Sequence, residues 1–301
     1  MNQVAVLCAA GLVAGGVVVS GLRQAQAIPR LSRDGQIAQP EPRRGAGASV
    51  TPAYEGWYYN PDGSRTFLVG YYNRNSAQEL DIPIGPNNRI EPGGPDMGQP
   101  THFLNGRQWG MFTIPAPKDF KPTDAYRWTI VANGQTMSIP LRLHNDYVMS
   151  PFAEIAVGNT PPIVRFEQNG KPMQGPAALL ASAPDRTASL ATPFALGLWT
   201  TDDMKYTSGT NAPLSRPRPP VLLRWSKYRG PGTVTFDKAV PEIEKLASGE
   251  GAFSGKATTT VKFGAAGDYV LHLIANDYSG DGGGGFGCCW TTTLLKVSVK
   301  P

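Results

Sequence analysis

Short runs of apolar and polar residues alternate along most of this chain, with glycine and proline between the runs. Side chains of a strand point to opposite faces in turn, so alternation with a period of two predicts strands. Aromatic and β-branched residues, which strands favour, dominate the runs in the first part of the chain. We therefore predict strands there at residues 54–60, 65–73, 79–84, 108–114, 126–132 and 136–143.

A tight hairpin is predicted at Asn133-Gly134, between the last two of these runs. Asparagine and glycine tolerate the positive φ angles that a two-residue turn needs. No stretch of ten or more residues in this part of the sequence has helical periodicity. The first part of the chain is therefore predicted to contain strands and turns only.

The carboxy-terminal part repeats the pattern, with runs at the spacing typical of a β-sandwich. One segment differs, because residues 239–248, which include Glu242 and Glu244, favour a short helical turn with solvated charges. The other runs predict about seven strands, at residues 162–168, 188–199, 221–228, 232–236, 257–263, 269–277 and 291–300.

The amino terminus has the pattern of an export signal. Residues 4–22 carry no charge, and Ala25 and Ala27 place small side chains where signal peptidase requires them, so we expect cleavage after Ala27. A retained membrane anchor is the alternative, because the apolar run is long enough to span a bilayer. Residues 28–51 are rich in proline and arginine and predict a flexible linker.

These observations together predict an all-β fold. We expect two immunoglobulin-like β-sandwich modules, at residues 52–150 and 155–301, after a signal peptide (1–27) and the linker (28–51). The protein would be secreted or periplasmic, and would touch a membrane only if residues 4–22 were retained. The net charge of +5 is spread along the chain, which argues against nucleic acid as a partner.

A set of short motifs marks the carboxy-terminal half: Trp225-Ser226, Gly230-Pro231-Gly232, Val234-Thr235-Phe236, Val261-Lys262-Phe263, Gly267-Asp268-Tyr269 and Ala275-Asn276-Asp277. With these residues, the half resembles the PKD-type immunoglobulin-like modules of extracellular proteins. The resemblance covers residues 161–301 and implies the sandwich fold, with Trp225 between the sheets and Tyr269 at the corner that opens the penultimate strand. Such sandwiches serve many unrelated roles, so no activity follows.

The amino-terminal half resembles a segment found in uncharacterised exported bacterial proteins, which implies export and nothing more. The matching stretches are Tyr54-Glu55-Gly56-Trp57-Tyr58, Gly70-Tyr71-Tyr72-Asn73, Leu80-Asp81-Ile82-Pro83-Ile84-Gly85, Pro100-Thr101-His102-Phe103-Leu104 and Arg107-Gln108-Trp109-Gly110.

Exposed aromatic rings offer a face on which a sugar can stack, and loops on a rigid scaffold often carry binding residues. The loop at residues 91–107 is our first candidate for ligand contact, and a second candidate is the glycine-rich stretch at residues 277–290. The ordinary alternative is that the aromatic residues fill a core. The candidate ligand-binding residues are Trp57, Tyr59, His102, Trp109, Phe286 and Trp290.

Cys288 and Cys289 are the only cysteines that remain after signal removal. In an oxidising compartment they could form a vicinal disulfide, pair with other chains, or stay reduced and bind copper(I). Asp277 and Asp281 are weak candidate ligands for calcium, because two carboxylates fall short of a full oxygen shell. We therefore expect no resident cofactor, with calcium or copper as the ions to test.

The sequence contains no recognisable catalytic motif, and His102, His144 and His272 lack metal-ligand spacing. We predict an exported, non-catalytic binding or adhesion protein whose partner is an envelope or extracellular polysaccharide or protein. The alternatives are a periplasmic metal-handling protein that uses Cys288 and Cys289, and a hydrolase with its site between the modules.

Overall fold

Most of the chain after residue 43 is described by this computed structural model. The described residues are 44–154, 158–205, 219–247, 251–277 and 288–301, with the backbone of the paired strands β1 (Arg30–Leu31) and β2 (Ile37–Ala38). The predicted signal peptide, Asp281 and Phe286 lie outside this set. Within it, no helix has the length and apolar character needed to cross a membrane.

The chain divides into two compact units, Met1–Pro42 and Arg43–Pro301. The larger unit begins before the module boundary expected at residue 52, since residues 48–50 are fully buried. Its regular elements are strands and two short 3₁₀ turns, η1 (Asn145–Tyr147) and η2 (Leu180–Ser182), which confirms the all-β prediction.

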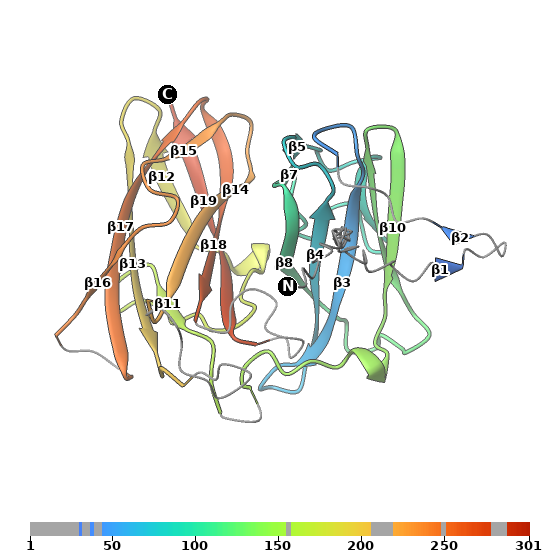
Figure 1. Cartoon of the computed structure of the whole chain (residues 1–301), viewed down its shortest axis with the longest axis horizontal. Coiled ribbons are helices and arrows are strands. Elements are labelled where there is room, and N and C mark those ends of the chain that lie inside the picture. Colours follow the sequence, from blue (N-terminus) through green and yellow to red (C-terminus); the bar gives the residue numbers. More distant parts are fainter. Residues whose placement is uncertain are drawn as a thin grey trace, which may run out of the picture. The chain divides into compact units, whose positions relative to one another are not determined.

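Eight strands make up the first half of the larger unit (Figure 1): β3 (Val50–Tyr59), β4 (Arg65–Asn73), β5 (Leu80–Asp81), β6 (Asn88–Glu91), β7 (His102–Phe103), β8 (Gly106–Pro115), β9 (Tyr126–Ala132) and β10 (Gln135–Leu141). They form antiparallel sheets of order β3-β4-β8 and β10-β9-β6, and a short β5-β7 pair. The two larger sheets share one core, in which the rings of Phe112 and Trp128 meet edge to face with centroids 5.1 Å apart.

The predicted hairpin is confirmed. β9 and β10 pair across Asn133 and Gly134, whose φ angles are 49° and 75°. β4 and β9 have the predicted bounds. The sequence analysis missed β6 and β7, which are only four and two residues long and are flanked by proline and glycine.

Nine strands make up the second half: β11 (Ile163–Arg165), β12 (Asp185–Ser189), β13 (Phe194–Asp202), β14 (Leu222–Arg229), β15 (Val234–Phe236), β16 (Ile243–Lys245), β17 (Phe253–Phe263), β18 (Gly267–Asn276) and β19 (Trp290–Lys300). One sheet has the order β11-β13-β17-β15, with β16 also on β17, and the other has the order β12-β19-β18-β14. Among the strands described in this half, β12 pairs with β19 in parallel and the other pairings are antiparallel. Side chains of both sheets form one core that contains Trp225 and Tyr269.

Two predictions in the second half were wrong. Residues 243–245 form β16 rather than a helical turn, because Ile243 pairs with Ala257 and packs on the core. The single strand predicted at 188–199 is two strands in different sheets, β12 and β13, separated by a turn at residues 190–193.

The two halves share apolar side chains. Val270, Ile274 and Leu294 project from β18 and β19 on the side away from the second half's own core, and they are buried in clusters with residues of the first half. Trp290 lies against Gly110, where an added methyl group would come within 3.1 Å of the indole Nε1. The contact between the halves therefore resembles the interior of a single domain.

Charged and polar groups close the edge of this contact. Arg229 binds the Asp96 carboxylate at 2.8 Å, and Lys227 Nζ lies 3.0 Å from Asp81 Oδ1. The hydroxyl of Tyr228 donates a hydrogen bond to the Gly98 carbonyl oxygen at 2.5 Å. All three donors come from the end of β14, so this strand helps to fix how the two halves are aligned with each other.

We expect Leu294→Ala to destabilise both halves together. Truncating a fully buried leucine costs about 2–5 kcal/mol, and Leu294 lies in the cluster that both halves share. Calorimetry should show one unfolding transition, shifted to lower temperature as a whole. Lys300→Ala, an exposed position at the end of the same strand, should leave the transition in place. Two separate transitions, of which only one moves, would contradict this prediction.

His272 makes the stability of this contact depend on pH. The side chain is buried, stacks on Tyr228 with centroids 6.0 Å apart, and burial lowers the pKa of His272 to about 4. The unfolded chain, with a histidine pKa near 6.5, binds more protons between pH 4 and 6.5. Stability therefore falls as the pH drops through that window, by up to about 3 kcal/mol.

His272→Leu should remove that dependence. The difference in unfolding free energy between the variant and the wild type, measured by urea denaturation, should grow steadily in favour of the variant from pH 6.5 to pH 4. A difference that stays constant over this range would show that His272 keeps an ordinary pKa in the folded protein.

Candidate functional site

The aromatic residues predicted to bind a ligand are mostly structural. Trp57 and Trp290 are each only 3% exposed. Trp57 Nε1 donates a hydrogen bond to the His144 carbonyl oxygen at 2.8 Å, and its ring packs against the edge of Tyr59. Tyr59 is 57% exposed and is the one of these three rings that faces solvent. Trp57 and its neighbour Tyr58 are both buried, in different clusters, so both faces of β3 are covered at this point.

His102 belongs to a network of charges rather than to an open loop. Its Nδ1 lies 3.0 Å from Asp81 Oδ1 and its Nε2 lies 3.2 Å from Glu79 Oε2. Lys227 Nζ, from the second half, also lies 3.0 Å from Asp81 Oδ1. Partial burial alone would raise the pKa of Asp81, but the hydrogen bonds and positive charges of Lys227 and His102 lower it by more. Both ring nitrogens are occupied, so His102 has no free atom for a ligand.

Trp109 is 38% exposed and carries the guanidinium of Arg107 over its ring at 3.8 Å. Arg107 also binds both oxygens of Glu55, at 2.6 and 2.7 Å. Burial raises the pKa of Glu55, an effect that Arg107 partly offsets. The Trp109 ring therefore lies at the surface beneath the guanidinium of Arg107, which the buried Glu55 carboxylate holds in place.

The predicted residues do not form one site. Tyr59 pairs with Arg65 at one end of β4, while the residue before Trp109 pairs with Tyr71 near the other end. Six residues of strand separate these positions, or about 20 Å. Tyr59 and Trp109 therefore cannot contact the same small ligand.

A cavity lined by described residues lies where the two halves meet, and we call it the central cleft. Its volume is about 620 Å³, within the size range of small-molecule sites. The first half contributes the turn at residues 60–66 and the end of β8, and the second half contributes residues 166–186. The sequence analysis named none of these residues as a candidate for ligand binding.

Apolar and polar groups are mixed in the central cleft. Aromatic and apolar surface comes from Tyr58, Phe166 and Met173, and four prolines also line it: Pro115, Pro172, Pro176 and Pro184. Charged groups are Asp62, Glu167, Lys171 and Arg186. Hydroxyl and amide groups of Asn60, Ser64, Thr66, Gln174 and Thr293 complete the lining.

Both carboxylates of the central cleft have polar partners. Hydrogen bonds from the side chain and backbone of Ser64 lower the pKa of Asp62. Glu167 is bound by Arg186 at 2.8 Å. Each carboxylate is therefore held in place by a neighbouring side chain.

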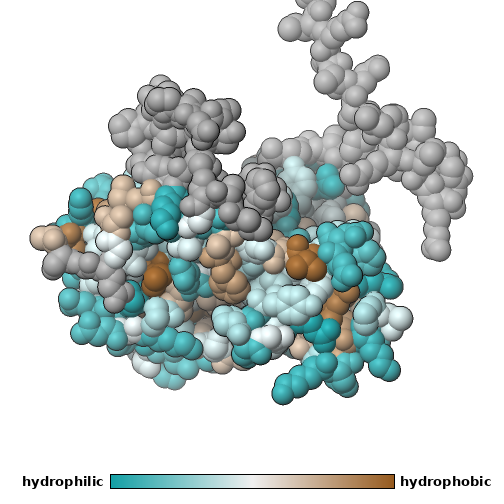
Figure 2. Space-filling model, turned by 90° about the horizontal axis from the view of Figure 1, so that it is seen from below, coloured by the Kyte–Doolittle hydropathy of each residue, from teal (hydrophilic) through white to brown (hydrophobic). Residues whose placement is uncertain are grey.

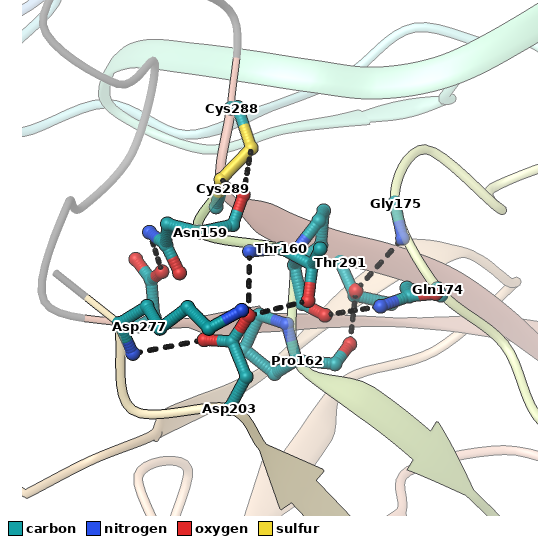
Figure 3. The surroundings of a disulfide bond; sticks show 12 residues. Asn159, Thr160, Pro162, Gln174, Gly175, Asp203, Asp277, Cys288, Cys289 and Thr291 are labelled. Atoms are coloured by element: carbon teal, nitrogen blue, oxygen red, sulfur yellow. Dashed lines mark hydrogen bonds between the residues drawn. A yellow bond between two sulfur atoms is a disulfide. The ribbon is translucent and has the colours of Figure 1, made fainter. Parts of the chain in front are cut away.

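The cysteine pair lies at the start of β19, away from the lining of the central cleft. The sulfur atoms of Cys288 and Cys289 are joined as a vicinal disulfide, and both contact the carbonyl oxygen of Asn159, at 3.9 and 3.4 Å (Figure 3). Both residues are buried. The structure thus has the first of the three outcomes considered for this pair.

Polar side chains surround the disulfide. Asn159 Nδ2 donates to Asp277 Oδ2 at 2.6 Å, and both the backbone and the hydroxyl of Thr160 donate to Asp203 Oδ2 (Figure 3). No group of three or more histidine, cysteine, aspartate or glutamate side chains placed to hold a metal occurs in the described part of the chain. Figure 2 views the molecule from below Figure 1, and there the described apolar residues form small separate groups among polar ones.

Comparisons with known proteins assign no family. No protein-family model and no curated protein matches the chain. Domains 4 and 5 of the S-layer protein SbsC match with 10% identity over 84% of this chain and 98% of that one, at a TM-score of 0.22. The endo-fucoidan hydrolase MfFcnA4 of glycoside hydrolase family 107 matches with 11% identity over 90% of this chain and 29% of that one, at a TM-score of 0.23.

Dimeric latent PorU from Porphyromonas gingivalis matches with 10% identity over 83% of this chain and 24% of that one, at a TM-score of 0.24. This chain therefore spans less than a third of the hydrolase and of PorU. At such TM-scores, none of these similarities decides a fold or a function.

We expect Arg107→Met to destabilise the protein by about 3–5 kcal/mol, because it leaves the buried Glu55 carboxylate without its counter-charge. The double variant Arg107→Met/Glu55→Gln should lose less than the single variant, which urea unfolding would show. Arg89→Met serves as the control, since the Arg89–Glu91 pair is far more exposed. A double variant less stable than Arg107→Met would contradict the assigned pairing.

Proposed function

We propose that this protein is an exported, non-catalytic binding protein of the cell envelope, with an extracellular polysaccharide held in the central cleft. The observation that carries the proposal is the lining of the cleft, in which both halves supply polar groups among aromatic and apolar ones. Sugar rings combine apolar faces with a fringe of hydroxyl groups, so a mixed lining with aromatic side chains suits them.

Export is part of the same proposal and depends on the amino-terminal pattern, with its uncharged run at residues 4–22 and small side chains at Ala25 and Ala27. The vicinal disulfide supports it, because disulfides persist in oxidising compartments. The proline- and arginine-rich linker would hold the folded unit away from the membrane or wall.

We further propose that the second half is an immunoglobulin-like sandwich of the PKD type. Its first two strands, β11 and β12, lie in opposite sheets, and β12 runs parallel to the last strand, β19. The sheet orders β11-β13-β17-β15 and β12-β19-β18-β14 match the two-sheet division of that fold. The fold supplies a rigid wall for the cleft, while the residues of the cleft supply the function.

Filling the cleft tests the binding proposal. Ser182→Trp places an indole at an exposed lining position, and we expect at least about a tenfold loss of affinity, or about 1.4 kcal/mol. Thr260→Trp, an exposed position on β17 outside the cleft, is the matched control. Binding would be measured by co-sedimentation with purified cell-wall polysaccharide and by calorimetry with its soluble fragments.

Each outcome separates the alternatives. Loss of binding in Ser182→Trp alone supports the proposal. Equal binding by all three proteins would place the ligand elsewhere, and no binding to any polysaccharide would turn attention to a protein partner. New reducing ends released from the polymer would favour the hydrolase.

A further inference from the structure

The side chains that point between the two sheets of the second half change from apolar to polar at one end of the sandwich. Alternate residues of a strand share a face, and on β13 the core residue Leu198 is followed on that face by Thr200 and Asp202. On β18 the core residue Ala275 is followed in the same way by Asp277. The two strands lie in opposite sheets, so both sheets place a carboxylate at this end.

The polar groups at this end are deeply buried, and some of their oxygen atoms lack a hydrogen-bond partner among the described residues. Asp202 is 4% exposed and Asn159 is 2% exposed. Among the described residues, Asp202 Oδ2, Asn159 Oδ1 and Thr200 Oγ1 have no hydrogen-bond partner. Native proteins leave very few buried oxygens unsatisfied, and a group of them indicates a missing ion or water.

The charges at this end repel one another. Burial is the first reason that the pKa of Asp202 rises to about 7, and the neighbouring Asp277 and Asp203 raise it further against one hydrogen bond from the Met204 amide. Asn159 donates its amide nitrogen to Asp277 Oδ2, and Figure 3 shows these two side chains facing each other beside the disulfide. Its unpartnered amide oxygen is therefore held next to the acidic pair.

We propose that Asp202, Asp277 and the amide oxygen of Asn159 form a binding site for a divalent cation, with calcium as the matching ion. Calcium takes hard oxygen ligands from carboxylates, amide carbonyls and water. Copper(I) and zinc prefer sulfur or imidazole, and both nearby sulfur atoms belong to the disulfide. The site has two carboxylates, which agrees with the lack of a three-residue metal group in the described chain.

Calcium at this position would join three segments. Asn159 precedes β11, Asp202 ends β13 and Asp277 directly follows β18. The cation would therefore connect the two sheets where apolar packing ends. This role is independent of the central cleft, so the site can be correct whether or not the cleft binds a polysaccharide.

The test is calcium binding by the full chain after dialysis against EDTA. Isothermal titration calorimetry with calcium chloride should show one site, and calcium at about a hundred times its Kd should raise the melting temperature by about 5 °C. Asp202→Asn should lose both the heat of binding and the shift. Asp268→Asn, an exposed aspartate at the start of β18, should keep both.

Asn159→Leu provides a second variant if Asp202→Asn does not fold, because it removes a neutral ligand and should weaken calcium binding at least tenfold. The proposal is overturned if the wild-type chain shows neither heat nor a shift with calcium. It is equally overturned if Asp202→Asn or Asn159→Leu binds calcium as the wild type does.

Discussion

The structure depends on a sheet that is buried on both of its faces. One side of β18 contributes Tyr269 and Leu271 to the core of the second half, and the other side places Val270 and Ile274 against the first half. β19 does the same with Val297 on one side and Leu294 on the other. Separating the halves would expose this second face to water, at roughly 25 cal/mol for each Å² of apolar surface.

This double burial also accounts for the central cleft. The halves are held together by apolar contacts and by the ion pairs of β14, so the protein's own packing joins the two walls of the cleft. A site whose walls are already in place loses less conformational entropy on binding than one formed by hinged domains. The cleft is thus a product of the packing between the halves, although its lining residues come from turns and loops.

The sequence predicted individual strands well and the contact between the halves not at all. β17 alternates buried and exposed residues from Phe253 to Phe263, as its sequence does, and it is buried on one face. β18 was also interpreted as alternating, yet every residue from Tyr269 to Asn276 is buried. Its run of valine, leucine and isoleucine at residues 270–274, interrupted only by His272, was the available signal, because largely apolar runs are typical of strands covered on both sides.

The candidate site was less predictable for a different physical reason. Aromatic residues on strands were chosen because rings can bind sugars, but Trp57 and Trp290 have more to gain from burial in a core. The cleft combines residues 60–66 with residues 166–186, which are about a hundred positions apart and carry no motif. Their proximity follows from the packing of the halves, so a sequence that does not reveal that packing cannot reveal the cleft.

Two sets of buried ionisable side chains, His272 and the acidic pair Asp202 and Asp277, are accommodated in different ways. His272 is a buried imidazole in the contact between the halves, and losing its proton lets it remain there as a neutral ring. The acidic end of the second half cannot be neutralised as simply, because Asp202 and Asp277 are buried near each other and Asn159 adds a third oxygen. Protonation would neutralise one carboxylate but would leave the amide oxygen unsatisfied. A cation placed between the two carboxylates would also satisfy the amide oxygen of Asn159 and Asp202 Oδ2, which is why the convergence of these groups, rather than the burial of any one of them, indicates a ligand.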